Sequence, residues 1–156
     1  MSLIQDCFGE IRQEIPLSFE VIDLCDERYN LWQENTRITE AQEDGCEIIR
    51  NDSHTLTFDL DGEKQLERFK SRVGILEKKG FSPAIEIYKS RHGNYHAIVK
   101  CGESFELTEP IALAIQAALG SDWKREILGV LRYLNKQFAQ NSMLFKPKNA
   151  EVVKFP

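Results

Sequence analysis

The stretch Thr55-Leu56-Thr57-Phe58-Asp59-Leu60-Asp61-Gly62 alternates strictly between apolar and polar side chains. Successive side chains of a β-strand point to opposite faces of a sheet. We therefore expect Asp59 and Asp61 to share one face of a strand whose other face packs inward through Leu56, Phe58 and Leu60. Neighbouring carboxylates repel each other unless one is protonated or a cation lies between them. The pair indicates either a divalent-metal site or, as is commoner for an isolated pair, an acidic face exposed to solvent.

The residues on either side of this strand predict an α+β fold, with a small mixed or antiparallel sheet that carries helices on one face. After Gly62 we expect a helix at 63–79, strands at 84–89 and 95–101, helices at 109–120 and 123–139, and a last strand at 142–146. Before it we expect helices at 2–15 and 18–32, then a meander of short strands at 36–42 and 46–50. One domain is expected over 1–156, with an amino-terminal α/β part at 1–53, a core at 54–147 and a loosely held tail at 148–156.

Composition is that of an ordinary soluble globular protein of 156 residues, 42% of them hydrophobic and 29% charged. The four cysteines contain no C-x-x-C pair, which argues against a zinc ribbon and favours a cytoplasmic protein. No apolar run reaches the roughly 20 residues that span a bilayer, so we expect no membrane association. Residues 1–61 hold 15 acidic and 4 basic residues, whereas residues 62–156 hold 10 acidic and 16 basic ones. The second part therefore carries a positive charge that could attract phosphate.

A second group of polar residues lies in the turn Ser90-Arg91-His92-Gly93-Asn94 and the strand that follows it. The Ser90 hydroxyl and the turn's amides can hold phosphate oxygens, Arg91 adds positive charge, and His96 begins the returning strand. Strand alternation places His96 on the face that we expect for Asp59. The alternative for His96 is a strand residue with a local hydrogen bond, which is about equally common.

A third carboxylate, Asp122, stands at the predicted start of a helix in Gly120-Ser121-Asp122-Trp123. Capping the helix would by itself explain an aspartate there. Two Mg²⁺ or Mn²⁺ ions, however, need carboxylate oxygens from several elements, and a strand pair with one remote aspartate supplies them.

Three motifs together, F-D-L-D-G, S-R-H-G-N-Y-H ahead of A-I-V-K, and G-S-D-W-K-R-E, resemble those of the archaeo-eukaryotic primase superfamily in order and spacing. The resemblance covers about residues 56–147 and implies an RRM-like catalytic unit. It implies that Asp59, Asp61 and Asp122 are catalytic residues that bind Mg²⁺ or Mn²⁺. Nucleotide-phosphate contacts are implied for Ser90 and His96, with Arg91 and Arg125 as further contacts to the triphosphate.

The activity implied by this resemblance is nucleotidyl transfer, with synthesis or extension of a DNA or RNA primer from nucleoside triphosphates. The implied partners are the nucleoside triphosphates, a DNA template that is single-stranded or primed, and a replicative helicase. Unlike some members of the superfamily, the chain has no zinc-binding Cys/His cluster.

Two other interpretations stay open. F-D-L-D-G also resembles the nucleophile motif of haloacid-dehalogenase-type phosphatases, although Glu63 stands where that motif normally has threonine. Alternatively, the chain is a non-catalytic replication or regulatory protein that binds nucleotides or nucleic acid, with Tyr88 and Tyr95 as candidates for base stacking.

Overall fold

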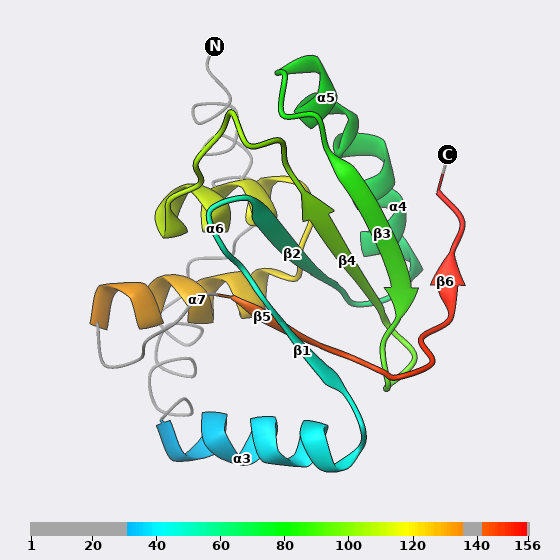
Figure 1. The fold of residues 1–156 in the computed structure, drawn as a ribbon, viewed down its shortest axis with the longest axis vertical. Coiled ribbons are helices and arrows are strands. Elements are labelled where there is room, and N and C mark those ends of the chain that lie inside the picture. The colour runs from blue at the N-terminus through cyan, green and yellow to red at the C-terminus, as the bar shows by residue number, and fades with distance from the viewer. Residues whose placement is uncertain (1–30, 136–141, 156) are drawn as a thin grey trace.

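The computed structural model describes residues 31–135 and 142–155, which form two small antiparallel sheets and five helices (Figure 1). In the four-stranded sheet the order is β2 (Thr55–Leu60), β4 (Tyr95–Lys100), β3 (Ala84–Lys89) and β6 (Val152–Val153). A separate ribbon pairs β1 (Glu47–Arg50) with β5 (Met143–Lys146). The helices are α3 (Leu31–Glu43), α4 (Glu63–Arg72), α5 (Gly74–Lys78), α6 (Glu109–Ala118) and α7 (Trp123–Asn135). The predicted α+β class is confirmed.

The apolar face of β2 forms the main core, as the alternation predicted. Leu56, Phe58 and Leu60 are each 0% exposed. They pack with buried residues of α4 and α6, and the rings of Phe58 and Phe69 lie 4.8 Å apart. Each fully buried side chain of this kind contributes about 1.5–3 kcal/mol to folding. This burial fixes which face of β2 is left for its polar residues.

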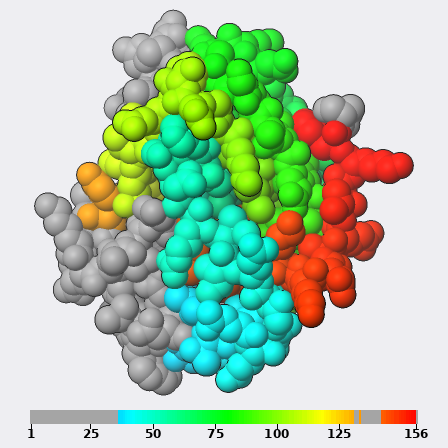
Figure 2. Space-filling model, viewed as in Figure 1, coloured from blue at the N-terminus to red at the C-terminus, as the bar shows by residue number. Residues whose placement is uncertain are grey.

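The opposite face of the sheet is covered by the β1–β5 ribbon. Leu144 of β5 packs against Tyr88 and Ile98 of the sheet, and these three buried residues form a second, smaller core. Figure 1 shows the ribbon between the four-stranded sheet and α3, and Figure 2 shows the surface of β1, in cyan, beside the orange-red surface of the carboxy-terminal residues. The polar side chains of β2 therefore lie in a partly enclosed layer.

Three details of the predicted fold were wrong. The weak alternation at 36–42 lies inside helix α3, where Ala41 is fully buried three residues after the partly buried Ile38. Strand β1 pairs with β5, about a hundred residues later, and forms no meander with its neighbours. The tail is held, because β6 pairs with β3 and the Lys89 amide donates to the Glu151 carbonyl at 2.9 Å. The helix predicted at 2–15 and residues 18–30 of the helix predicted at 18–32 lie outside the described residues.

None of the helices in the described ranges is long and apolar enough to cross a membrane.

Candidate functional site

The edge of β2 is hydrogen-bonded by the segment that begins α7. The Asp59 N–H donates to the Ser121 hydroxyl oxygen at 3.0 Å, and the Asp122 N–H donates to the Asp59 carbonyl at 2.6 Å. A strand at a sheet edge needs such partners because its outward main-chain groups have no neighbouring strand. These two bonds place the side chains of Asp59 and Asp122 beside each other, although 62 residues separate them in sequence.

Two residues further back, the same edge is held by side chains of α6 and α7. The Thr57 N–H donates to Gln116 Oε1 at 3.0 Å, and Arg125 Nη1 donates to the Thr57 carbonyl at 2.8 Å. Gln116 is 0% exposed, and its Nε2 donates to Glu126 Oε2 at 2.9 Å and to Ser142 Oγ at 3.3 Å. The edge of β2 is thus anchored to a buried polar network.

His96 lies directly opposite Asp59 in the β2–β4 register. Its Nε2 is 3.6 Å from Asp59 Oδ1, and its Nδ1 is 3.2 Å from the Tyr88 hydroxyl of β3. The Tyr88 and His96 rings meet edge to face, with centroids 5.4 Å apart. Three neighbouring strands therefore contribute Asp59, His96 and Tyr88 to one row across the sheet, as the alternation predicted for the first two.

Burial shifts both ionisable groups of the Asp59–His96 pair toward their neutral forms. Burial raises the pKa of the Asp59 carboxyl to about 6, and the neighbouring Asp122 and Asp61 carboxylates add to the rise while Arg125 opposes it. Burial also lowers the pKa of His96 to about 4, and the positive charge of Arg125 lowers it further. A cation bound beside Asp59 would favour its ionised form.

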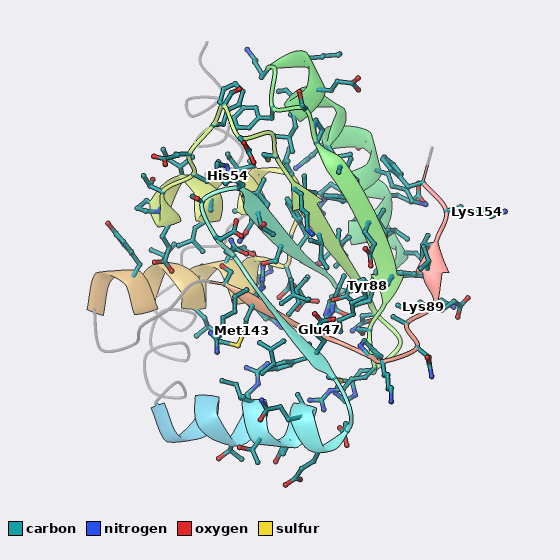
Figure 3. All side chains as sticks on the ribbon, in the orientation of Figure 1. Glu47, His54, Tyr88, Lys89, Met143 and Lys154 are labelled. Carbon is teal, nitrogen blue, oxygen red and sulfur yellow. The ribbon has the colours of Figure 1, made fainter. Side chains whose placement is uncertain are left out.

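The side chains of Asp59, His96, Asp122 and Arg125 line a cavity of about 260 Å³. The rest of its lining is basic or mainly apolar, and consists of Arg37, Lys124, Leu128, Met143, Leu144 and Phe145. In this cavity two carboxylates and an imidazole from the three sequence motifs meet the positive charges of α3 and α7. Met143, labelled in Figure 3, brings β5 to the same place.

Arg125, predicted as a triphosphate contact, has its guanidinium bound within the protein. Nη1 donates to the Thr57 carbonyl and to Glu126 Oε1, at 2.8 and 2.6 Å. Nη2 donates to Thr57 Oγ1 at 2.5 Å and to the Met143 carbonyl at 3.2 Å. A guanidinium has five N–H donors, so these bonds use all four on Nη1 and Nη2. Arg125 therefore supplies a fixed positive charge beside Asp59, and its terminal N–H groups are already used and do not favour a hydrogen bond to a ligand.

Arg37 and Lys124 are cavity residues that the sequence motifs did not include as ligands. Arg37 is exposed on α3, and no hydrogen bond or ion pair joins it to another residue in the described ranges. Lys124 lies over the Trp123 ring at 5.7 Å. The motifs gave no signal for Arg37, because it reaches the cavity through the packing of α3 on β1.

Asp61 lies just beyond the end of β2 and is exposed outside the cavity lining. Its N–H donates to Gln65 Oε1 at 2.7 Å, and Gln65 Nε2 donates to Asp122 Oδ1 at 3.2 Å. Gln65 of α4 thus connects the main chain at Asp61 to the Asp122 carboxylate. The Asp61 carboxylate adds to the rise in the pKa of Asp59, whose main cause is burial.

Ser90 and Arg91, the predicted anion cradle, are not part of the cavity lining. Ser90 Oγ accepts a hydrogen bond from the Asn94 N–H at 3.1 Å and so closes its own hairpin turn. Arg91 pairs with Asp44 at 2.6 Å and lies over the Phe145 ring at 5.7 Å. Of the predicted site residues, the structure therefore brings Asp59, His96, Asp122 and Arg125 together in the cavity lining. Asp61, Ser90 and Arg91 lie outside that lining.

Within the described ranges, no group of three or more His, Cys, Asp or Glu side chains is arranged to hold a metal ion. The two cavity carboxylates, Asp59 and Asp122, nevertheless suit Mg²⁺ or Mn²⁺ in donor type, because these ions prefer oxygen ligands. Mg²⁺ is commonly held by one or two carboxylates together with waters and substrate phosphates. Two carboxylates are too few to enclose an ion by themselves, and they fit an ion whose other ligands are waters and the oxygens of a bound phosphate.

Comparisons of the chain with protein-family models, with curated proteins and with solved structures found no match.

Proposed function

We propose that the cavity binds a nucleoside triphosphate with Mg²⁺ or Mn²⁺, and that the protein transfers the nucleotidyl group to a 3'-hydroxyl on a DNA template. The observation that carries this proposal is the meeting of Asp59, His96 and Asp122 at one cavity. These residues come from three separate motifs that resemble those of the archaeo-eukaryotic primase superfamily. A metal at the two carboxylates would lower the pKa of the attacking hydroxyl and neutralise charge on the triphosphate.

The hydrogen bonds that each cavity residue already makes suggest its role in binding the nucleotide and the metal. Asp59 and Asp122 are the carboxylates of the cavity, and their main chains are joined, so their separation is fixed before a ligand arrives. Arg37 and Lys124 are exposed cations at the cavity and are free to move toward phosphate oxygens. Arg125 is held by four hydrogen bonds and adds a constant positive charge. These exposed cations favour binding of the triphosphate at the part of the cavity that Arg37 lines.

The non-catalytic interpretation is the second candidate, and two observations favour it. The described residues include no preformed group of three metal-binding side chains, and Asp59 is partly protonated near pH 6. A protein that binds nucleotides without turnover would need no more than the cations and His96. The phosphatase interpretation is disfavoured, because β2 pairs with β4 in antiparallel fashion and that family uses a parallel sheet.

An incorporation assay separates these candidates. Purified protein would be incubated with labelled nucleoside triphosphates, template and either Mg²⁺ or Mn²⁺, with and without a primer. We expect metal-dependent extension by the wild type, and a loss of at least a hundredfold in Asp59→Asn and in Asp122→Asn. Glu103→Gln, which changes an exposed carboxylate outside the cavity lining, is the matched control. Binding without product would favour the second candidate, and equal product from Asp59→Asn would contradict the catalytic proposal.

A further inference from the structure

The Tyr88 hydroxyl is a buried polar group that the proposed reaction does not yet use. Tyr88 is 0% exposed, and Figure 3 labels it on β3, where the sheet meets the β1–β5 ribbon. Among the described residues, its hydroxyl has one hydrogen-bond partner, His96 Nδ1 at 3.2 Å. A buried hydroxyl whose proton has no acceptor is unfavourable. The Tyr88 O–H therefore donates to His96 Nδ1.

This direction of donation decides where the imidazole proton lies. In a neutral imidazole one nitrogen carries the proton and the other accepts a hydrogen bond. Because Nδ1 accepts from Tyr88, the proton of neutral His96 lies on Nε2, the nitrogen that faces Asp59 Oδ1 at 3.6 Å. In the other tautomer the Tyr88 proton would have no acceptor among the described residues, and the lone pair on Nε2 would face the Asp59 carboxylate. Both effects favour the Nε2–H form.

We propose that Tyr88 is a positioning residue that holds His96 in its Nε2–H tautomer, so that His96 donates a hydrogen bond to a phosphate oxygen in the cavity and does not ligate the metal. A metal ligand needs a lone pair directed at the ion, and in this tautomer the lone pair on Nδ1 is directed at Tyr88 instead. The phosphate ligand in this proposal rests on the proposed nucleotide site. The tautomer of His96 is inferred from its contacts with Tyr88 and Asp59 and does not depend on that site.

Two tyrosines that neighbour His96, Tyr88 on the next strand and Tyr95 on its own strand, provide a matched pair of variants. Tyr88→Phe removes the hydroxyl next to His96 and keeps the buried ring. Tyr95→Phe removes a hydroxyl that is hydrogen-bonded to Glu63. Tyr95 lies on the same strand as His96, but its side chain is on the opposite face of the sheet. Both changes delete one oxygen from a strand tyrosine, so a difference between them reports on the contact with His96.

The tautomer can be read directly from the ¹⁵N spectrum of protein labelled at its three histidines, at pH 8, where an ordinary histidine is neutral. His96→Gln identifies the His96 signals by their loss. We expect a protonated Nε2 and an unprotonated Nδ1 in the wild type and in Tyr95→Phe, and a mixture of both tautomers in Tyr88→Phe. A protonated Nδ1 in the wild type, or an unchanged tautomer in Tyr88→Phe, would overturn the proposal.

Addition of Mg²⁺ and pyrophosphate to the same labelled protein tests the phosphate half separately. We expect the His96 Nε2–H signal to shift on binding, and Tyr88→Phe to weaken the apparent affinity about fivefold, the value of one lost positioning bond of about 1 kcal/mol. If the tautomer is as proposed but pyrophosphate leaves the His96 signals unchanged, the role of His96 as a phosphate donor is contradicted. That result counts against the nucleotide site, and the effect of Tyr88 on the tautomer stands.

Discussion

The main-chain N–H of Asp122 donates to the main-chain carbonyl of Asp59 at 2.6 Å, which joins the start of α7 to the edge of β2. The two carboxylates of the cavity are therefore placed by the backbone. Burial raises the pKa of Asp59, and the nearby Asp122 carboxylate adds to the rise while Arg125 opposes it. A carboxyl with a pKa perturbed in this way is common at functional sites.

Ser121 is predicted to be a major anchor of this junction. It is buried, accepts from the Asp59 N–H at 3.0 Å and donates to Glu126 Oε1 at 2.8 Å. Ser121→Ala would leave both buried groups without this partner, and we expect it to lower the free energy of unfolding by about 2 kcal/mol. Urea denaturation measures the change, with the exposed Ser104→Ala as control. A loss no larger than that of the control would contradict the anchoring role.

Gln116 is the centre of the buried network behind the site. Its Oε1 accepts from Asn51 Nδ2 at 2.6 Å and from the Thr57 N–H, and its Nε2 donates to Glu126 and Ser142. Gln116→Leu keeps a similar volume but leaves several buried polar groups without this partner. We expect a loss of about 3 kcal/mol in the free energy of unfolding. If thermal unfolding shows the variant to be as stable as the wild type, the network does not support β2.

The Asp59–His96 pair predicts how stability depends on pH in the metal-free protein. Asp59 has a pKa of about 6, above its ordinary 3.8, so its stabilising contribution is present below pH 3.8 and is lost as the pH rises through 6. His96 has a pKa of about 4, below its ordinary 6.5, so its contribution is present above pH 6.5 and is lost as the pH falls through 4. The two effects oppose each other between pH 4 and 6.

Asp59→Asn removes the titration of Asp59 and leaves that of His96. We expect the free energy of unfolding of the variant to rise from pH 4 to 6.5 more steeply than that of the wild type, and to exceed it above pH 6. The excess should be about 1 kcal/mol, a value reduced for solvent screening because the Asp59 side chain is 34% exposed. Urea titrations between pH 4 and 8 measure both quantities. A variant less stable than the wild type at pH 7 would show that the buried charge is already compensated.

Arg37 is predicted to bind phosphate without supporting the fold. It is exposed at the cavity, and no described residue is its hydrogen-bond or ion-pair partner. We expect Arg37→Ala to weaken the binding of Mg²⁺ and nucleotide about tenfold, to leave the midpoint of thermal unfolding unchanged, and to be partly rescued by Arg37→Lys.

Arg125→Lys provides the contrast to the Arg37 variants. It removes a guanidinium with four internal hydrogen bonds, and we expect it to lower the unfolding midpoint. If the Arg37 variants bind nucleotide as the wild type does, the phosphate chain does not lie at α3.

Part of this site could be predicted from sequence because the signals are local. Alternation with a period of two placed Asp59 on the non-core face of β2, and the same rule placed His96 on the matching face of β4. The lone glutamine in the apolar helix Glu109–Ala118 also signals a buried hydrogen-bonding position. By contrast, the contact of Arg37 with the cavity depends on how β1 pairs with β5, which no local pattern encodes.

The same distinction explains the details of the site that the sequence did not reveal. Arg125 is hydrogen-bonded to Thr57 and Glu126, and its bond to Thr57 depends on how the start of α7 is placed against β2. Ser90 closes its own turn, which a serine in a glycine-containing hairpin does as readily as it binds an anion. Residue type predicted the chemistry available at each position, and tertiary packing decided which groups remained available.

If Asp59 and Asp122 hold a divalent cation together with a nucleotide, binding of the nucleotide depends on the metal, and calorimetric titration of a nucleoside triphosphate measures that dependence. We predict that the wild type and Glu103→Gln bind the nucleotide in the presence of Mg²⁺ or Mn²⁺, and that chelation of the metal abolishes the binding heat. Asp59→Asn and Asp122→Asn should each weaken metal-dependent binding at least tenfold. Equal affinity with and without metal, or unchanged affinity in both aspartate variants, would show that Asp59 and Asp122 do not hold a metal together with the nucleotide.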